Sequence, residues 1–249
     1  MSEPKPTLNI QSKISFIEQQ TELGRVLRFP VPENFSYLPG QFVMLKMELQ
    51  EKNGFKILNG KPKTQQRAFS MSSSPTQKGF VETAVKEEEN GFVSKYLNRV
   101  AELGDPIIIS GPYGHFHFSE LDSEEIVLLG AGSGITPLIS ILRYISDKKL
   151  STRATLLYSN RSESDTIYYK ELKELAQKTP NIKIIFTKTR QPEWPGEKGR
   201  ITLDIVKKFV SDLSRPIYFI CGSPDFSKSC KEFLLGAGIP QEKVKTEQW

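Results

Sequence analysis

The stretch QRAFSMSSSP, residues 66–75, places a cation, an aromatic ring and a run of hydroxyls where a strand meets a Ser/Pro-rich turn. If residues 66–70 are extended, the two-residue period of a strand puts Arg67 and Phe69 on one face. Ser70 then points to the other face and needs a bend to join them. Because a guanidinium can bind a phosphate next to a ring that covers a flat group, the stretch predicts a site for a planar, phosphate-bearing ligand.

The chain around this stretch, from residue 8 to about 118, has the pattern of a small antiparallel barrel. Short apolar segments alternate with Pro/Gly turns, and only Phe92 to Val100 has helical spacing. Many short strands with one helix favour a barrel. Residues 115–118 alternate His and Phe as on one short strand, and we expect both histidines to be structural rather than catalytic. The expected strands are Ile14–Gln19, Leu23–Phe29, Gln41–Met47, Phe80–Val85 and Pro106–Ile109.

The start of the single helix in this half predicts an anion site. Gly91, Phe92, Val93 and Ser94 open the helix, so free backbone N–H groups and the positive end of its dipole face whatever lies ahead. Ser94 also fits an ordinary first helical turn. Two phosphate-type features in one barrel favour a ligand with more than one phosphate.

After residue 119 the sequence pattern changes: apolar runs alternate with segments of helical spacing, which predicts a parallel sheet with helices on both faces. The strand Ile126–Leu129 runs into GAGSGITP, residues 130–137, which contains Gly132, Ser133, Gly134, Thr136 and Pro137. The glycines allow a phosphate to approach the backbone at a helix N-terminus. The third glycine comes one residue earlier than in the usual dinucleotide fingerprint.

The next strand end, at Ser159, Asn160 and Arg161, lies where ligands bind in parallel sheets. Ser159 and Arg161 could hold an adenosine 2'-phosphate, whereas Asp165 would repel one. The residues therefore leave the choice between NADH and NADPH open. They also fit a plain solvated loop.

The C-terminal part adds a strand end at Cys221 and Gly222 and a final Glu247-Gln248-Trp249. A cysteine at a strand end is often a small buried hydrophobe, and Cys230 in the following helix is expected in the core. A terminal Trp is unusual because chain ends are commonly polar and frayed.

Six motifs together resemble the ferredoxin-NADP reductase superfamily over residues 8–249. They are Arg-x-Phe-Ser at 67–70, Gly-x-x-Ser at 91–94, Gly-Pro-x-Gly at 111–114, Gly-x-Gly-x-Gly-x-Thr-Pro at 130–137, Cys-Gly-x-Pro at 221–224, and an acidic residue two places before a terminal aromatic. The resemblance implies an antiparallel β-barrel FAD domain at residues 1–120, followed by an α/β doubly wound NAD(P) domain at residues 121–249. The string after Tyr158 is similar to NADH-dependent nitrate reductase flavin domains, which favours NADH.

The resemblance also implies the activity and the site. NADH or NADPH would pass a hydride to flavin N5, and the electrons would go to a separate protein, either ferredoxin-like or another iron-sulfur or haem protein. The implied catalytic residues are Ser70, Cys221, Glu247 and Trp249. Of these, Trp249 would stack on the flavin. Implied cofactor-binding residues are Arg67, Ala68, Phe69, Ser70, Val85, Lys86, Gly91, Phe92, Val93, Ser94, Gly132, Ser133, Gly134, Thr136, Pro137, Ser159, Asn160, Arg161, Asp165, Cys221, Gly222 and Trp249. Two alternatives stay open: a reductase that uses free flavin as a substrate, and a non-catalytic flavoprotein subunit.

Composition excludes several other classes. The net charge of +5 is spread along the chain, so no basic stripe for nucleic acid is expected, although a basic face suits an acidic partner. Two cysteines without a C-x-x-C pair disfavour disulfide, zinc and iron-sulfur sites in this chain. No stretch approaches the ~20 apolar residues of a membrane span, and the N-terminus carries no signal-peptide pattern. We therefore expect a cytoplasmic protein without a metal site.

Overall fold

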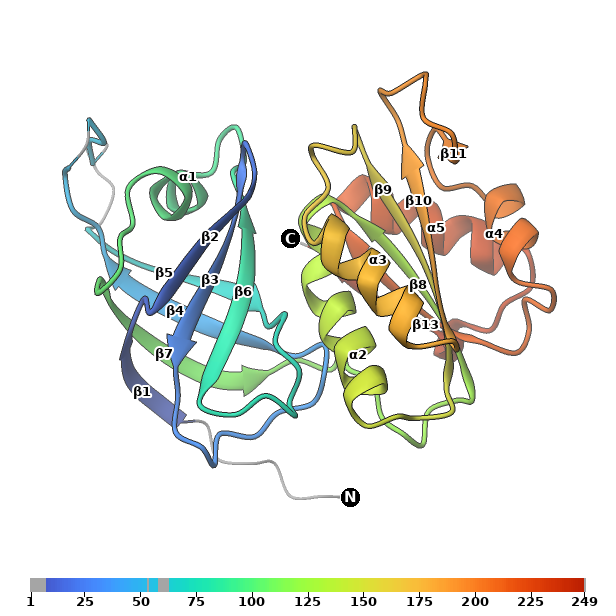
Figure 1. Ribbon diagram of the computed structural model, residues 1–249, viewed down its shortest axis with the longest axis horizontal. Helices are drawn as coiled ribbons and strands as arrows, with labels where there is room; N and C mark the ends of the chain where they lie inside the picture. The colour runs from blue at the N-terminus through green and yellow to red at the C-terminus, as the bar shows by residue number, and fades with distance from the viewer. Residues whose placement is uncertain (1–7, 53, 58–62, 249) are drawn as a thin grey trace.

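The structure is a computed structural model that describes residues 8–52, 54–57 and 63–248. Antiparallel sheets occupy residues 8–113, hereafter the barrel, and a parallel sheet occupies residues 125–248, hereafter the α/β part. Figure 1 shows the two side by side, with the barrel at the left. The expected fold class, a barrel followed by a doubly wound sheet, is confirmed.

The barrel consists of a four-stranded and a three-stranded sheet that curve around one apolar core. The strand order is β1-β7-β4-β5 in the first sheet and β2-β3-β6 in the second. Helix α1 (Phe92–Arg99) closes the core with Val93, Tyr96 and Leu97. The strands are β1 (Leu8–Lys13), β2 (Phe16–Thr21), β3 (Gly24–Pro30), β4 (Phe42–Glu48), β5 (Thr64–Ser70), β6 (Phe80–Lys86) and β7 (Pro106–Tyr113).

The α/β part is a six-stranded parallel sheet in the order β11-β10-β9-β8-β12-β13. Its strands are β8 (Glu125–Ala131), β9 (Arg153–Asn160), β10 (Ile182–Lys188), β11 (Glu197–Lys198), β12 (Ile217–Gly222) and β13 (Val244–Gln248). Its helices are α2 (Ile135–Asp147), α3 (Tyr169–Lys178), α4 (Leu203–Phe209) and α5 (Pro224–Gly236).

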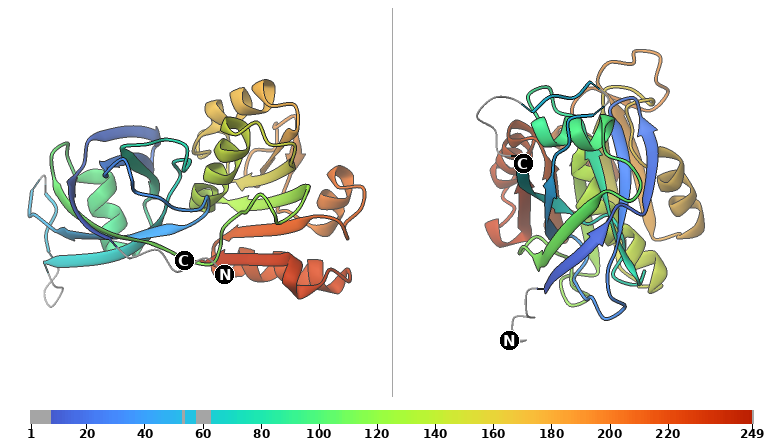
Figure 2. Two further views of the ribbon diagram at one scale, coloured as in Figure 1. Left: turned by 90° about the horizontal axis from the view of Figure 1, so that it is seen from below. Right: turned by 90° about the vertical axis from the view of Figure 1, so that its left-hand side faces the viewer.

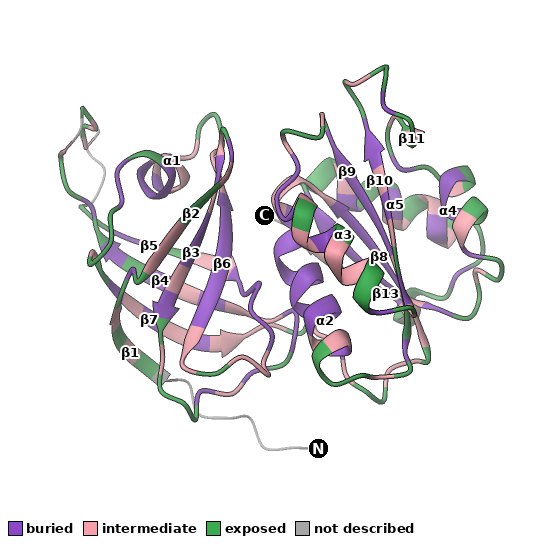
Figure 3. Cartoon of the chain, viewed as in Figure 1, coloured by how far each residue is buried: buried purple, intermediate pink, exposed green. Residues whose placement is uncertain are grey.

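Alternate residues of the central strands face the two helical layers, as the strand period requires. Ile126 and Leu128 pack with α2 and α3, whereas Val127 and Leu129 pack with α4 and α5. Figure 2 shows the two layers on opposite faces of the sheet, and Figure 3 shows the central strands buried along most of their length. Burial on both faces explains why these strands read as continuous apolar runs.

Most expected elements are confirmed within a residue or two, but the short strand at residues 115–118 was wrong. These residues form the irregular connection between barrel and α/β part, in which Phe118 N donates to Pro39 O at 3.0 Å. Phe116 and Phe118 are both buried, Phe116 with its ring against Phe219. Tertiary packing of the two phenylalanines therefore determines the conformation here, and the alternation of His and Phe does not produce a strand.

Strands β1 and β13 were not expected from the sequence. Both are edge strands: β1 pairs with β7 at the other end of the barrel sequence, and β13 pairs with the preceding strand β12. Within the described ranges, no helix is long and apolar enough to cross a membrane, and no cluster of His, Cys, Asp and Glu could hold a metal ion.

Candidate functional site

Ser70 and Glu247 meet where the barrel and the α/β part come together. Ser70 ends β5 and is 2% exposed, and its Oγ donates to Glu247 Oε2 at 3.1 Å. Glu247 lies on β13, 177 residues further along the chain. Burial raises the pKa of Glu247 to about 7, against the opposing effect of the Ser70 hydrogen bond. This carboxyl can therefore gain or lose a proton near neutral pH.

Cys221 lies directly beside Glu247 in the sheet. The two residues are paired between parallel strands β12 and β13, and Cys221 also faces Gly130 of β8. The Cys221 side chain is fully buried. The carboxyl ends of β8, β12 and β13 thus bring together the Gly-rich loop, Cys221 and Glu247, which were predicted separately as parts of the site.

The loop after β8 packs against the backbone of Cys221. Gly132–Gly134 form a 3-10 turn that leads into α2, and Gly132 has a φ of +54°. A Cβ on Gly134 would lie 2.1 Å from the Cys221 carbonyl oxygen, so only glycine fits. Thr136 Oγ1 donates to Ser133 O at 2.7 Å, and Pro137 is buried in the first turn of α2. The loop presents the N-terminus of a 13-residue helix at the carboxyl edge of the sheet.

Arg67, Ala68 and Phe69 lie along β5, next to Ser70. Arg67 is exposed, and its Nη1 donates to Gln66 O at 2.7 Å. In the described part of the chain its guanidinium has no carboxylate partner. Phe69 packs partly against the barrel core and is otherwise open. Within the described residues, a cation without an ion pair therefore lies on the same strand as a half-buried aromatic ring.

The start of α1 is organised by its own side chains. Gly91 is the N-cap residue, and Ser94 Oγ accepts from Glu88 N and donates to Gly91 O, both at 3.1 Å. A Cβ on Gly91 would lie 2.3 Å from that hydroxyl. The Ser94 side chain thus shapes the turn, and the backbone N–H groups of Phe92 and Val93 stay available at the helix start.

Val85 and Lys86 end strand β6. The Val85 side chain belongs to the barrel core. Burial lowers the pKa of Lys86, with Asp165 acting against it and Arg161 with it. The charges of Arg161 and Asp165, two residues of the loop after β9, therefore act on Lys86 of the barrel.

The end of β9 carries a buried polar side chain. Asn160 is 6% exposed and lies close to the Tyr158 hydroxyl, but within the described residues neither its side-chain oxygen nor its nitrogen makes a hydrogen bond of good geometry. Ser159 is buried, Arg161 is exposed, and Asp165 accepts from Ser162 Oγ at 2.9 Å. A buried amide without partners is costly for a folded protein unless a ligand satisfies it. Trp249, the remaining candidate, lies outside the described residues.

Comparison with known proteins identifies the family. A family model described as an oxidoreductase FAD-binding domain matches residues 12–118, and one described as an oxidoreductase NAD-binding domain matches residues 128–232. The gamma subunit of sulfhydrogenase 1 from Pyrococcus furiosus is 33% identical over 90% of this chain and 73% of its own length. The chain belongs to the ferredoxin-NADP reductase superfamily. It is an FAD- and NAD(P)H-dependent oxidoreductase of this type.

Other members of the superfamily agree in fold and differ in length. The glycine betaine monooxygenase reductase subunit of Chromohalobacter salexigens is 26% identical over 88% of this chain, but the match spans only 57% of that protein. A ferredoxin NADP⁺ reductase from Neisseria gonorrhoeae, solved with bound FAD and NADP, is similar in fold, with a TM-score of 0.79 at 20% sequence identity. The structural match covers 96% of this chain and 98% of the reductase chain.

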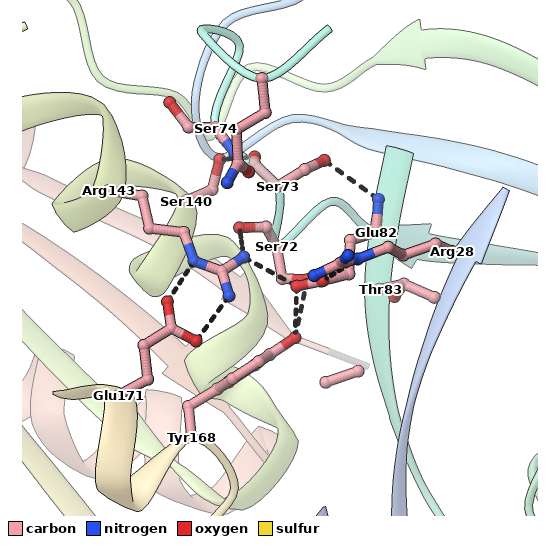
Figure 4. Close-up of polar contacts among 12 residues, drawn as sticks. Arg28, Ser72, Ser73, Ser74, Glu82, Thr83, Ser140, Arg143, Tyr168 and Glu171 are labelled. Carbon is pink, nitrogen blue, oxygen red and sulfur yellow. Dashed lines mark hydrogen bonds and ion pairs between the residues drawn. The ribbon is translucent and has the colours of Figure 1, made fainter. Parts of the chain in front are cut away.

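A buried polar cluster between the barrel and the α/β part was missed by the sequence reading (Figure 4). It centres on Glu82 of β6, Arg143 of α2 and Tyr168, the residue before α3. The sequence did contain a signal for this cluster. Arg143 is a charged residue in a mainly apolar helix, and Glu82 is a charged residue in a mainly apolar strand. Charged residues in such places are almost never fully buried unless they are paired.

Proposed function

We propose that this superfamily member moves hydride from NADH or NADPH to a bound FAD and passes the electrons to a separate protein. The Ser70–Glu247 hydrogen bond supports this most directly, because it joins the end of the predicted flavin strand to the edge that carries Cys221 and the Gly-rich loop. The proposed parts are residues 1–120 for FAD and 121–249 for the nucleotide.

The barrel residues fit an FAD molecule. Arg67, which has no carboxylate partner among the described residues, would hold a phosphate, and Phe69 would stack on the flat ring. The helix start at Gly91, Phe92, Val93 and Ser94 would face the second phosphate. Ala68, Lys86 and the backbone of Val85 would line the site between the ring and the second phosphate, and Trp249 would cover the ring from the far side.

The α/β residues fit a dinucleotide. The helix start formed by Gly132, Ser133, Gly134, Thr136 and Pro137 suits a pyrophosphate. The Asn160 amide, which makes no hydrogen bond of good geometry within the described residues, supports a polar ligand at the end of β9, with Ser159, Arg161 and Asp165 around it. Cys221 and Gly222, at the end of β12, would contact the nicotinamide ring.

Ser70 and Glu247 would supply or accept the proton that accompanies reduction and reoxidation of the flavin. A bound flavin supplies the redox step, since it accepts two electrons together and releases them singly. When Glu247 is protonated, its carboxyl would donate to Ser70 Oγ, which would leave the Ser70 hydroxyl free to donate a hydrogen bond toward the reacting ring. Because the pKa of Glu247 lies near 7, this carboxyl can resupply the proton from solvent.

The acceptor is proposed to be an iron-sulfur or haem protein. Relatives carry names such as monooxygenase reductase subunit and sulfhydrogenase subunit gamma, which describe one component among several. This chain spans 73% and 57% of the lengths of these two relatives.

The visible absorption spectrum tests the proposal. The purified protein, kept free of oxygen, should show a bound-flavin spectrum that bleaches when NADH or NADPH is added. A colourless protein that reduces added flavin would support the flavin-reductase alternative. A yellow protein that ignores both nucleotides would support a non-catalytic subunit. As a matched pair, Arg67→Ala should lose the flavin and Arg200→Ala, an exposed arginine, should keep it.

A further inference from the structure

The cluster around Glu82 and Arg143 joins the two halves of the molecule through two charged groups that are almost fully buried. Glu82 is 2% exposed and Arg143 is 8% exposed, and Arg143 Nη1 contacts Glu82 Oε1 at 2.7 Å. Arg28 Nε contacts the other oxygen, Glu82 Oε2, at 2.7 Å. Burial alone would raise the pKa of Glu82, but the two guanidiniums outweigh it and hold that pKa below its usual value. Glu82 is thus a buried carboxylate whose second cation comes from the other half of the molecule.

Tyr168 completes the connection from the α/β side. Its hydroxyl lies 3.0 Å from Glu82 Oε1 and 2.8 Å from Ser72 Oγ, and the Arg143 guanidinium lies over its ring at 5.0 Å. Tyr168 has a φ of +60°, a left-handed backbone conformation that is uncommon outside glycine. Its backbone N–H donates to Gln20 Oε1 of the barrel at 3.0 Å. Both the backbone and the side chain of Tyr168 therefore bind the barrel.

The same cluster also contacts the serine turn that follows β5. Arg143 Nη1 donates to Ser72 O at 2.7 Å, and Ser140 Oγ donates to Ser73 O at 2.6 Å. Ser72 and Ser73 come two and three residues after Ser70. Arg143 and Ser140 lie one to two turns beyond the Gly-rich loop on α2. One helix thus carries the proposed nucleotide loop at its start and binds the end of the proposed flavin strand further along.

A buried ion pair of this kind fixes geometry better than it adds stability. Removing two charges from water largely cancels their attraction, so such pairs are often no more stabilising than an apolar replacement. Their directional hydrogen bonds nevertheless select one arrangement, and here every acceptor oxygen of Glu82 is used. By contrast, Glu171, the other partner of Arg143, lies in the α/β part itself and is partly exposed.

We propose that Arg143, Glu82 and Tyr168 form an interdomain lock that sets the distance between the nicotinamide and flavin sites. The three are positioning residues and touch neither ligand. The proposal rests on the proposed function, because it concerns the transfer between those two sites. Hydride transfer needs reacting atoms about 3–3.5 Å apart, so a loose lock lowers the transfer rate while each site still binds its own ligand.

Arg143→Met tests the lock through two separate readouts. The first is the rate of flavin bleaching at saturating NADH or NADPH in an oxygen-free stopped flow, which should fall about tenfold or more with KM within about threefold. The second is the distance distribution between spin labels on Glu22→Cys in the barrel and Lys178→Cys on α3, which should broaden. Both positions are exposed, and both native cysteines are buried and should escape labelling.

Two further variants keep the test decisive. Glu171→Gln removes the partner of Arg143 within the α/β part and should leave the rate and the distance distribution unchanged. Tyr168→Phe removes one hydroxyl and should fold even if Arg143→Met does not, with a smaller rate loss of about threefold and a measurable broadening.

The outcomes separate the lock from the proposed function. Unchanged distances with a lost rate, or broadened distances with an unchanged rate, would overturn the lock, as would wild-type behaviour of both Arg143→Met and Tyr168→Phe. If neither nucleotide reduces the wild-type protein, the proposed function fails, and the distance distributions of the labelled variants still report whether these residues hold the two halves in place.

Discussion

Glu247 shows how position decides the chemistry of a residue that looks ordinary in the sequence. Its pKa is about 7 because it is buried, and it lies against one barrel hydroxyl. A carboxyl whose pKa is raised in the folded state contributes stability that is complete below its unfolded pKa, near 4.5, and is lost as the pH rises through about 7. The wild-type protein should therefore become less stable relative to Glu247→Gln over this interval.

The expected size of that change is up to about 3 kcal/mol, at roughly 1.4 kcal/mol per pKa unit. Urea unfolding of both proteins between pH 4.5 and 8.5 would measure it. Glu242→Gln, an exposed neighbour, serves as the control and should show no such trend. Parallel pH curves for wild type and Glu247→Gln would mean that Glu247 is ionised normally.

Arg161 allows a separate prediction about the coenzyme. If its guanidinium binds a 2'-phosphate, Arg161→Ala should raise KM for NADPH about tenfold or more, or about 1.4 kcal/mol, and leave KM for NADH nearly unchanged. Steady-state kinetics with both coenzymes would measure this, with Arg200→Ala as a control. Equal effects on the two coenzymes would remove Arg161 from the phosphate site and favour Asp165 as the selecting residue.

Among the elements, the loop between β8 and α2 is the least tolerant of change. Gly134→Ala would place a Cβ 2.1 Å from the Cys221 carbonyl oxygen, so loop or strand must move. We expect a loss of about 1–3 kcal/mol in the free energy of unfolding and a strong loss of reduction by nucleotide. Gly236→Ala is the matched control, because a Cβ at this last residue of α5 meets nothing within 4 Å.

Thermal unfolding and nucleotide-dependent bleaching would measure both glycine variants. Gly236→Ala should be neutral or stabilising by about 0.5 kcal/mol, since alanine favours helix. Equal behaviour of the two variants would show that the approach between the loop and Cys221 can relax without cost.

Local pattern predicted the elements whose signals are contained in their own residues. The barrel strands other than β1, helix α1 and the loop at 130–137 fall in this class, because period, Pro/Gly punctuation and helix-start chemistry act over a few residues. Strand β13 could not be predicted in this way, because it becomes a strand only by pairing with β12. For the same reason Ser70 and Glu247 were named separately, and their hydrogen bond followed only from the fold.

At the scale of the whole molecule, the contact between the barrel and the α/β part is apolar as well as ionic. Val26 and Ala84 of the barrel belong to the same buried cluster as Ile135, Ile139 and Ile167 of the α/β part. The Glu82 ion pairs lie within this region. Because neither half can separate without exposing apolar surface and a buried charge, we expect both to unfold together.

Calorimetry should therefore show a single transition whose van't Hoff and calorimetric enthalpies agree. Arg143→Met leaves Glu82 with Arg28 as its cationic partner and should lower the melting temperature and split the transition in two. Arg153→Met removes a surface pair with Glu125, worth about 0–1 kcal/mol, and should leave a single transition near the wild-type temperature. Two transitions in the wild-type protein would mean that the halves are thermodynamically independent, and an ionic lock between independent halves could not hold the two proposed sites at one distance.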